Sequence, residues 1–147
     1  MPHHIFTVPC LRVIEDKSSG LVSLIDIVSS VRAVLGNTKE NKLLIPPFML
    51  FSKWMKTEHE NEKEEFEIML SFSLASKKQK KVIDKFKVEL PEGANGATIT
   101  LNIDSIELSS FGLWVVTISY KSIPNKSWRT VCELPFMVQG ERKSAGV

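Results

Sequence analysis

Short runs in which apolar and polar residues alternate recur along this chain, and they limit the folds that it can adopt. Residues 66–74 show the pattern best, with apolar side chains at every second position: Phe66, Ile68, Leu70, Phe72 and Leu74. A period of two is typical of a β-strand that turns one face to a core and the other to water. Seven or eight such runs, separated by turn-forming residues and without a convincing long helix, predict an all-β, antiparallel two-sheet sandwich. A closed barrel is the structural alternative.

Two C-terminal runs are the most informative for this architecture. Residues 112–120 are apolar at both parities, which is typical of a central strand between two layers. In residues 128–138 the apolar side chains share one parity: Trp128, Cys132, Leu134, Phe136 and Val138. Arg129 and Glu133 take the other parity, so this strand is expected to have one dry face and one wet face.

Length and composition indicate a single globular domain. The 147 residues suffice to bury a hydrophobic core without disulfides or metals. We expect a sandwich domain over residues 1–140 and a disordered tail over residues 141–147. With 43% apolar and 24% charged residues, the composition excludes a disordered or fibrous protein. The net charge of +2 is too small to indicate a nucleic-acid partner by itself.

Two segments do not follow a simple strand pattern. Residues 21–35 fit both a helical stripe and buried strands, and we expect a strand to about Ile27 followed by one short helical turn over residues 28–35. Helix and strand both remain open for that second half. Further along, the parity of the apolar residues changes between Ile103 and Ile106, which predicts a β-bulge near Asp104.

The first residues and the cysteines indicate the compartment. The N-terminus has neither a basic region nor a long apolar stretch, and no apolar run reaches membrane-spanning length, so we expect a cytoplasmic protein. Cys10 and Cys132 are then expected to be reduced thiols in the core, because a disulfide requires an oxidising compartment.

A resemblance adds to this pattern. It rests on five segments: Cys10-Leu-Arg-Val, Gly20-Leu-Val-Ser-Leu-Ile-Asp-Ile, Pro46-Pro47, Gly112-Leu-Trp and Glu133-Leu-Pro-Phe-Met-Val. Their succession resembles a family of small bacterial β-sandwich proteins of unknown function, with an immunoglobulin-like architecture, over nearly the whole chain. The resemblance implies the fold and a bacterial origin. It implies no activity, cofactor or catalytic residue.

No motif predicts catalysis, a metal or a cofactor. The histidines His3, His4 and His59 and the two widely separated cysteines have no ligand spacing, and we interpret the His3-His4 pair as a solvated terminus. The sequence contains no Gly-x-Ser-x-Gly motif and no phosphate-binding loop. We therefore expect no cofactor and no small-molecule substrate, and we favour a protein without enzymatic activity.

Two charged loops flank the strand over residues 66–74. The first is acidic and carries Glu58, Glu60 and Glu62; the second is basic and carries Lys77, Lys78, Lys80 and Lys81. At roughly 3.3 Å per residue the intervening strand separates them by about 30 Å, at opposite ends of the sandwich. The basic end should include Leu108 to Phe111 if strand directions alternate. The loops could steer a charged partner, or they could be solvated hairpin tips.

A second candidate surface lies on residues 48–55, which are apolar at both parities. A sandwich strand needs only one inner face, and Met49, Phe51 and Met55 share the parity opposite to Phe48. Either another part of the chain covers this second face, which we favour, or the face contacts a protein.

Three hypotheses about function follow. The leading one is a non-enzymatic protein-interaction or scaffold module that binds a partner or a second copy through the surfaces above. The second is a binder of anionic membrane or nucleic acid through the lysine loop. The third is an enzyme whose site is assembled from distant residues and is not visible in the sequence.

Overall fold

The computed structural model is an all-β protein. It describes residues 2–35, 43–56, 63–77, 79–104, 106–123 and 127–140. Within these residues the chain forms eleven strands. Their bounds are β1 His3–Glu15, β2 Val22–Ile27, β3 Ser30–Leu35, β4 Leu43–Ile45, β5 Phe48–Met55, β6 Glu64–Leu74, β7 Lys81–Leu90, β8 Gly96–Ile103, β9 Ile106–Leu108, β10 Gly112–Ser122 and β11 Arg129–Gly140.

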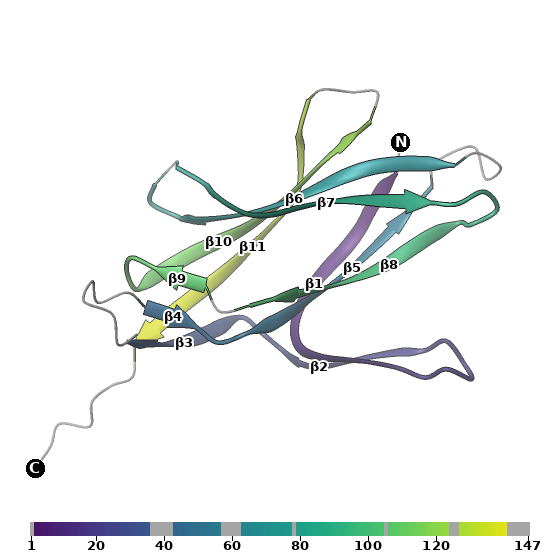
Figure 1. Cartoon of the computed structure of the whole chain (residues 1–147). Coiled ribbons are helices and arrows are strands. Elements are labelled where there is room, and N and C mark those ends of the chain that lie inside the picture. The colour runs from purple at the N-terminus through teal and green to yellow at the C-terminus, as the bar shows by residue number, and fades with distance from the viewer. Residues whose placement is uncertain are drawn as a thin grey trace, which may run out of the picture.

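The strands form two sheets, which confirms the predicted antiparallel sandwich (Figure 1). The four-stranded sheet has the order β2-β1-β5-β8, and the seven-stranded sheet has the order β7-β6-β10-β11-β3-β4-β9. Every pairing between described strands is antiparallel except that of β3 with β11. The β1–β2 hairpin continues past the point where β1 leaves β5 and extends from the lower side of the sandwich in Figure 1.

The core lies between the inner faces of the two sheets. The alternation seen in the sequence places one parity of each central strand there: Phe48, Leu50 and Trp54 of β5, Phe66, Ile68, Leu70 and Phe72 of β6, and Val116 and Ile118 of β10. Burying one large apolar side chain stabilises a fold by roughly 1.5–3 kcal/mol, so these residues dominate the stability of the sandwich.

An aromatic cluster closes one end of the core. The ring of Trp54, which is fully buried, lies 5.0 Å from that of Phe66 and 5.6 Å from that of Tyr120. Trp54 belongs to the four-stranded sheet, whereas Phe66 and Tyr120 belong to the seven-stranded sheet. Tilted and edge-on ring contacts of this kind add to the stabilisation from burial alone, so the cluster ties the two sheets together.

The predicted helical turn over residues 28–35 is wrong. Ser30–Leu35 forms β3, which pairs in parallel with β11 and antiparallel with β4. The local pattern suited both a helix and a strand. The strand forms because its backbone can hydrogen-bond to the edge of β11, which lies far away in the sequence. Since no helix forms in the described part of the chain, none there could cross a membrane.

The bulge predicted near Asp104 is also wrong. The parity changes there because the chain leaves the four-stranded sheet at the end of β8 and enters the seven-stranded sheet at β9. Ile103, Ile106 and Leu108 are all buried, because each strand turns its apolar parity to the same core. This crossing and the short strands β3, β4 and β9 explain why eleven strands form where seven or eight were expected.

A bulge does occur in β11, between Thr130 and Cys132, which pair with Ser119 and Ile118 of β10. It puts Trp128 out of phase with Cys132, so the two side chains do not share a face as the sequence pattern predicted. Cys132 packs against the core, whereas the half-buried ring of Trp128 lies beneath the ammonium groups of Lys85 and Lys121, 5.7 and 4.9 Å from its centre. The predicted tail over 141–147 lies outside the described residues.

Gly96 gives a test of the pairing between β5 and β8. A Cβ at this position would collide with the carbonyl oxygen of Trp54, whose backbone cannot move without breaking the ladder. We expect Gly96→Ala to lower the free energy of unfolding by about 2 kcal/mol, as overpacking usually does. Thr98→Ala, on an exposed position of the same strand, should change it by less than about 0.5 kcal/mol. Urea denaturation compares the two, and equal stabilities would contradict the close approach.

Candidate functional site

A cleft of about 580 Å³ opens at the basic end of the sandwich. One wall is the turn between β6 and β7, and the other is β9, which stands at the opposite end of the strand order of the same sheet. The lining residues are Phe72, Leu74, Lys77, Gln79, Lys80, Lys81, Ile106, Glu107, Leu108, Ser109 and Trp114. The expected neighbours of the lysine loop, Leu108 and Ser109, are therefore found beside it.

The floor of the cleft is apolar and aromatic. The rings of Phe72 and Trp114 lie 5.7 Å apart, and both side chains are buried, like Ile106 and Leu108 on the facing wall. The indole N–H of Trp114 donates a hydrogen bond to the carbonyl oxygen of Ser110 at 3.0 Å. Because this bond satisfies its polar atom, Trp114 offers only apolar ring surface to a ligand.

The rim of the cleft is cationic. Lys77, Lys80 and Lys81 are exposed there, and no ion pair joins any of them to a carboxylate in the part of the chain that the structure describes. Glu107 is the one carboxylate among the lining residues, which include neither His nor Cys. Lys78, the fourth lysine of the predicted basic loop, lies outside the described residues. The rim can therefore attract an anion, and the floor can hold an apolar group.

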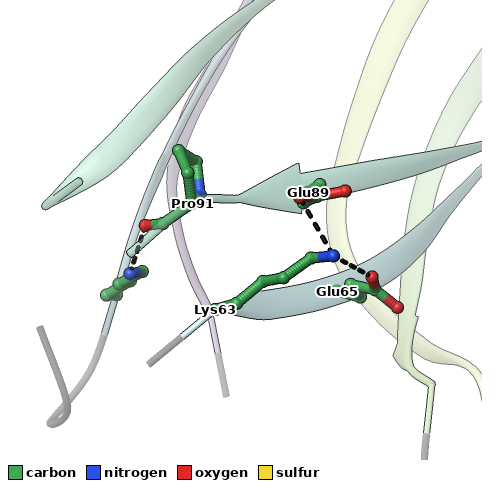
Figure 2. Close-up of polar contacts among 5 residues, drawn as sticks. Lys63, Glu65, Glu89 and Pro91 are labelled. Atoms are coloured by element: carbon green, nitrogen blue, oxygen red, sulfur yellow. Dashed lines mark hydrogen bonds and ion pairs between the residues drawn. The ribbon is translucent and has the colours of Figure 1, made fainter. Parts of the chain in front are cut away.

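At the other end of the sandwich, Lys63 is paired with two carboxylates. The ammonium group of Lys63 lies 2.9 Å from a carboxylate oxygen of Glu65 and 3.1 Å from one of Glu89 (Figure 2). Hydrogen bonds to Glu65 and Glu89 raise the pKa of Lys63. Nearby, Nζ of Lys56 donates to the carbonyl oxygen of Pro91 at 2.6 Å.

The predicted acidic residues Glu58, Glu60 and Glu62 fall outside the described residues. The two ends of the sandwich thus differ in their described lysines: Lys63 has two carboxylate partners, whereas Lys77, Lys80 and Lys81 at the cleft form no ion pair with a described carboxylate.

The outer face of the four-stranded sheet carries the second candidate surface. Met49, Phe51 and Met55 point away from the core, as the parity of the strand predicts. Their cross-strand neighbours on β1 are also apolar, since Val8 pairs with Phe51 and Cys10 with Met49. The ring of Phe6 packs 5.9 Å from that of Phe51, which this contact helps to bury.

The same face continues onto the β1–β2 hairpin. Cross-strand partners of an antiparallel pair point to the same side, and Cys10 pairs with Ile27 and Arg12 with Ile25. Ile14, Ile25 and Ile27 are 44%, 38% and 68% exposed. We call the side chains of Phe6, Val8, Cys10, Ile14, Ile25, Ile27, Met49, Phe51 and Met55 the apolar face. It is bordered on β8 by polar residues, because Thr100 is the partner of Phe51 and Asn102 that of Met49.

The outer face of the seven-stranded sheet has a different chemistry. Its centre carries small hydroxyl side chains that are buried among longer neighbours: Ser71, Ser73, Thr117 and Ser119. One cross-strand pair of exposed apolar residues, Leu113 and Met137, lies on this sheet near its end. Each sheet therefore buries one face in the common core. Among the side chains that the structure describes, the larger group of outward-facing apolar residues lies on the four-stranded sheet.

A chain of polar side chains lies inside the sandwich next to Trp54. Nε2 of His4 is 2.7 Å from Oγ1 of Thr7, which is 2.8 Å from Oγ of Ser52. The ring of His4 packs edge-on against that of Trp54 at 4.9 Å, so His4 is not the solvated residue that the sequence suggested. Thr7 and Ser52 are buried, and these hydrogen bonds satisfy their hydroxyl groups, which indicates a structural role for the chain.

The two cysteines are unpaired thiols. Burial raises the pKa of both, so they are protonated near neutral pH. Cys132 packs against the core as expected, whereas Cys10 is buried within the outer layer of the four-stranded sheet. In the described part of the chain no group of three or more His, Cys, Asp or Glu side chains could hold a metal ion.

No protein-family model and no curated protein sequence matches this chain. The resemblance to a bacterial sandwich family therefore stays a prediction.

Sequence reasoning found part of each surface and missed the rest. It singled out the lysines but not Phe72 and Trp114 beneath them, because it assigned both aromatics to the core. It found the apolar parity of β5 but not its continuation onto Ile25 and Ile27. The signal for this continuation was that residues 21–27 are apolar at both parities. A helix can account for this pattern, but so can a two-stranded ribbon that is exposed on both sides.

His4 predicts a pH dependence of stability. Burial lowers its pKa from the ordinary value of 6.5, so the unfolded chain binds this proton more readily than the folded one. The contribution of His4 to the free energy of unfolding is therefore complete above pH 6.5 and decreases as the pH falls below it. His4→Asn should flatten this dependence in thermal melts from neutral to mildly acidic pH. His3→Asn, at an exposed neighbour, is the control, and an equal flattening in both would contradict the assignment.

Proposed function

We propose that this protein is a non-enzymatic protein-interaction module that binds through the apolar face of its four-stranded sheet. The observation that carries the proposal is the group of outward-facing apolar side chains from Met55 to Ile14. Lys53 and Arg12 interrupt this group, and five of its members are exposed: Phe6, Ile14, Ile25, Ile27 and Met55. A sandwich needs only one buried face per sheet, so this group adds nothing to the core. Exposed apolar patches of such extent mark interaction surfaces in folded proteins.

The β1–β2 hairpin strengthens this argument. Its other side is also apolar, with Leu11 half exposed and Val13 paired with Leu24. A two-stranded ribbon is only marginally stable in water by itself. Among the described strands, β2 pairs with β1 alone. A partner that covers the hairpin would stabilise it and remove its apolar surface from water.

The partner that we propose is a second copy of this chain. Two identical apolar faces are complementary to each other across a two-fold axis, and the net charge of +2 gives little repulsion between copies. β1 alone spans 13 residues, about 40 Å at roughly 3.3 Å per residue. This length is compatible with an interface of standard size, about 800 Å² per partner. The polar side chains of β8 would then form its rim.

The proposal places the protein in the cytoplasm. The two unpaired thiols support this location, because an oxidising compartment favours disulfides. The buried Cys10 would lie beneath the interface, where its methylene and thiol add apolar area.

The oligomeric state tests the proposal. Light scattering behind gel filtration should show a dimer at high micromolar concentration. Ile25→Glu combined with Ile27→Glu should weaken it roughly a hundredfold or more, because each isoleucine would contribute about 1.5–3 kcal/mol on burial. Both side chains are exposed in the single chain, so the thermal stability of the monomer should be retained.

The matched control is Leu113→Glu combined with Met137→Glu. These residues are also exposed cross-strand neighbours, at 42% and 40%, but they lie on the other sheet. The control should remain a dimer. A strictly monomeric wild-type protein would refute self-association, as would a dimer that only the control disrupts. If the protein is a monomer that binds a different protein through Ile25 and Ile27, the apolar face would be supported as the binding surface, and a second copy would be refuted as its partner.

A further inference from the structure

The cleft at the basic end has the composition of a ligand site. Its volume of about 580 Å³ lies within the range of small-molecule pockets, roughly 300–1,000 Å³. Such pockets combine an apolar lining with a few polar groups that orient the ligand. Here the apolar part is the floor of Phe72 and Trp114, and the polar part is the rim of Lys77, Lys80 and Lys81.

The positions of the three lysines argue for an anion. Lys81 opens β7 opposite Phe72, and the backbone N–H of Lys77 donates to the carbonyl oxygen of Leu74, so the ladder and the turn hold both residues over the floor. Three cations at one rim repel each other, and no described carboxylate forms an ion pair with them. A bound anion would remove this repulsion and gain favourable Coulomb energy.

The floor argues against a bare inorganic anion. Phosphate alone would leave half-buried Leu74 and the small exposed part of Trp114 in contact with water, and the N–H of Trp114 is already bonded to Ser110. An apolar or aromatic group on the ligand would cover this apolar surface. The concave shape also argues against an extended duplex or strand, which needs a longer basic groove with several stacking platforms.

We propose that this cleft binds an amphipathic organic anion, with its carboxylate or phosphate head between Lys77, Lys80 and Lys81 and its apolar part against Leu74 and Trp114. The ligand can be a free small molecule or a lipid whose head and upper chain enter the cleft. This binding site is separate from the apolar face, so it does not depend on the proposed self-association.

The first experiment uses 8-anilinonaphthalene-1-sulfonate, an aromatic anion whose fluorescence rises in apolar surroundings. We expect saturable binding that n-decyl phosphate displaces and that inorganic phosphate displaces much less. Replacing the three rim lysines with glutamine should weaken binding roughly tenfold or more, because the favourable charges are lost. The control replaces Lys17, Lys85 and Lys87 with glutamine, which makes the same change in net charge away from the cleft.

A second variant tests the cleft itself without changing charge. Ser109 is an exposed lining residue, so Ser109→Trp should fill the cleft and weaken binding while the melting temperature is retained. Equal binding by the rim variant and its control would overturn the proposal. Displacement by inorganic phosphate as effective as by decyl phosphate would also overturn it, because the floor would then play no part.

Vesicles of phosphatidylcholine and phosphatidylserine distinguish the two sources of ligand. Co-sedimentation that Ser109→Trp abolishes would support a lipid in the cleft. Displacement by decyl phosphate without co-sedimentation would support a free small molecule. Co-sedimentation that persists in Ser109→Trp, with no binding of decyl phosphate, would overturn the proposal, since a flat contact between lysines and the membrane surface would explain it.

Discussion

The packing of Trp54 between the two sheets is the contact on which the rest of the structure depends. Its ring reaches from β5 to Phe66 and Tyr120 on the opposite sheet and also supports His4 from β1. Because side chains on one parity of β5 fill the core, those on the other parity must point outward. Since β5 has apolar residues at both parities, anchoring one parity in the core places the other parity on the outer face of the sheet. The apolar face results from this arrangement.

The path of the chain between the sheets creates the second surface. After β2, after β5 and again after β8 the chain leaves the four-stranded sheet and adds strands to the larger one. The last of these crossings brings β9 opposite the β6–β7 turn, and the cleft lies between them. Neither wall contains a site alone: the turn supplies the lysines, β9 supplies Ile106 and Leu108, and β10 supplies Trp114 beneath both. The two candidate surfaces thus arise from different structural causes and lie on different sheets.

Much of the fold could be predicted from local pattern. The strands over residues 66–74 and 48–55 follow from side-chain parity, since each turns a recognisable set of apolar residues to the core. The pattern failed where two structures satisfy it equally, as in Ser30–Leu35, and where a change of parity has more than one cause, as at Asp104. The lysines of the cleft were visible as a charge run. The aromatic floor was not, because a residue such as Trp114 can be buried in the core and also border a cleft.

The sequence by itself determined the fold class, the central strands, the unused apolar parity of β5 and the position of the lysine run. Each of these is encoded within a few neighbouring residues, by alternation or by charge. Only the tertiary structure decided that Ser30–Leu35 is a strand, that β8 and β9 belong to different sheets, and that Ile25 and Ile27 extend the apolar face. The physical reason is that strand pairing satisfies backbone hydrogen bonds with a partner far along the chain. The alternation of side chains records which face is dry, but it does not record which strand supplies that partner.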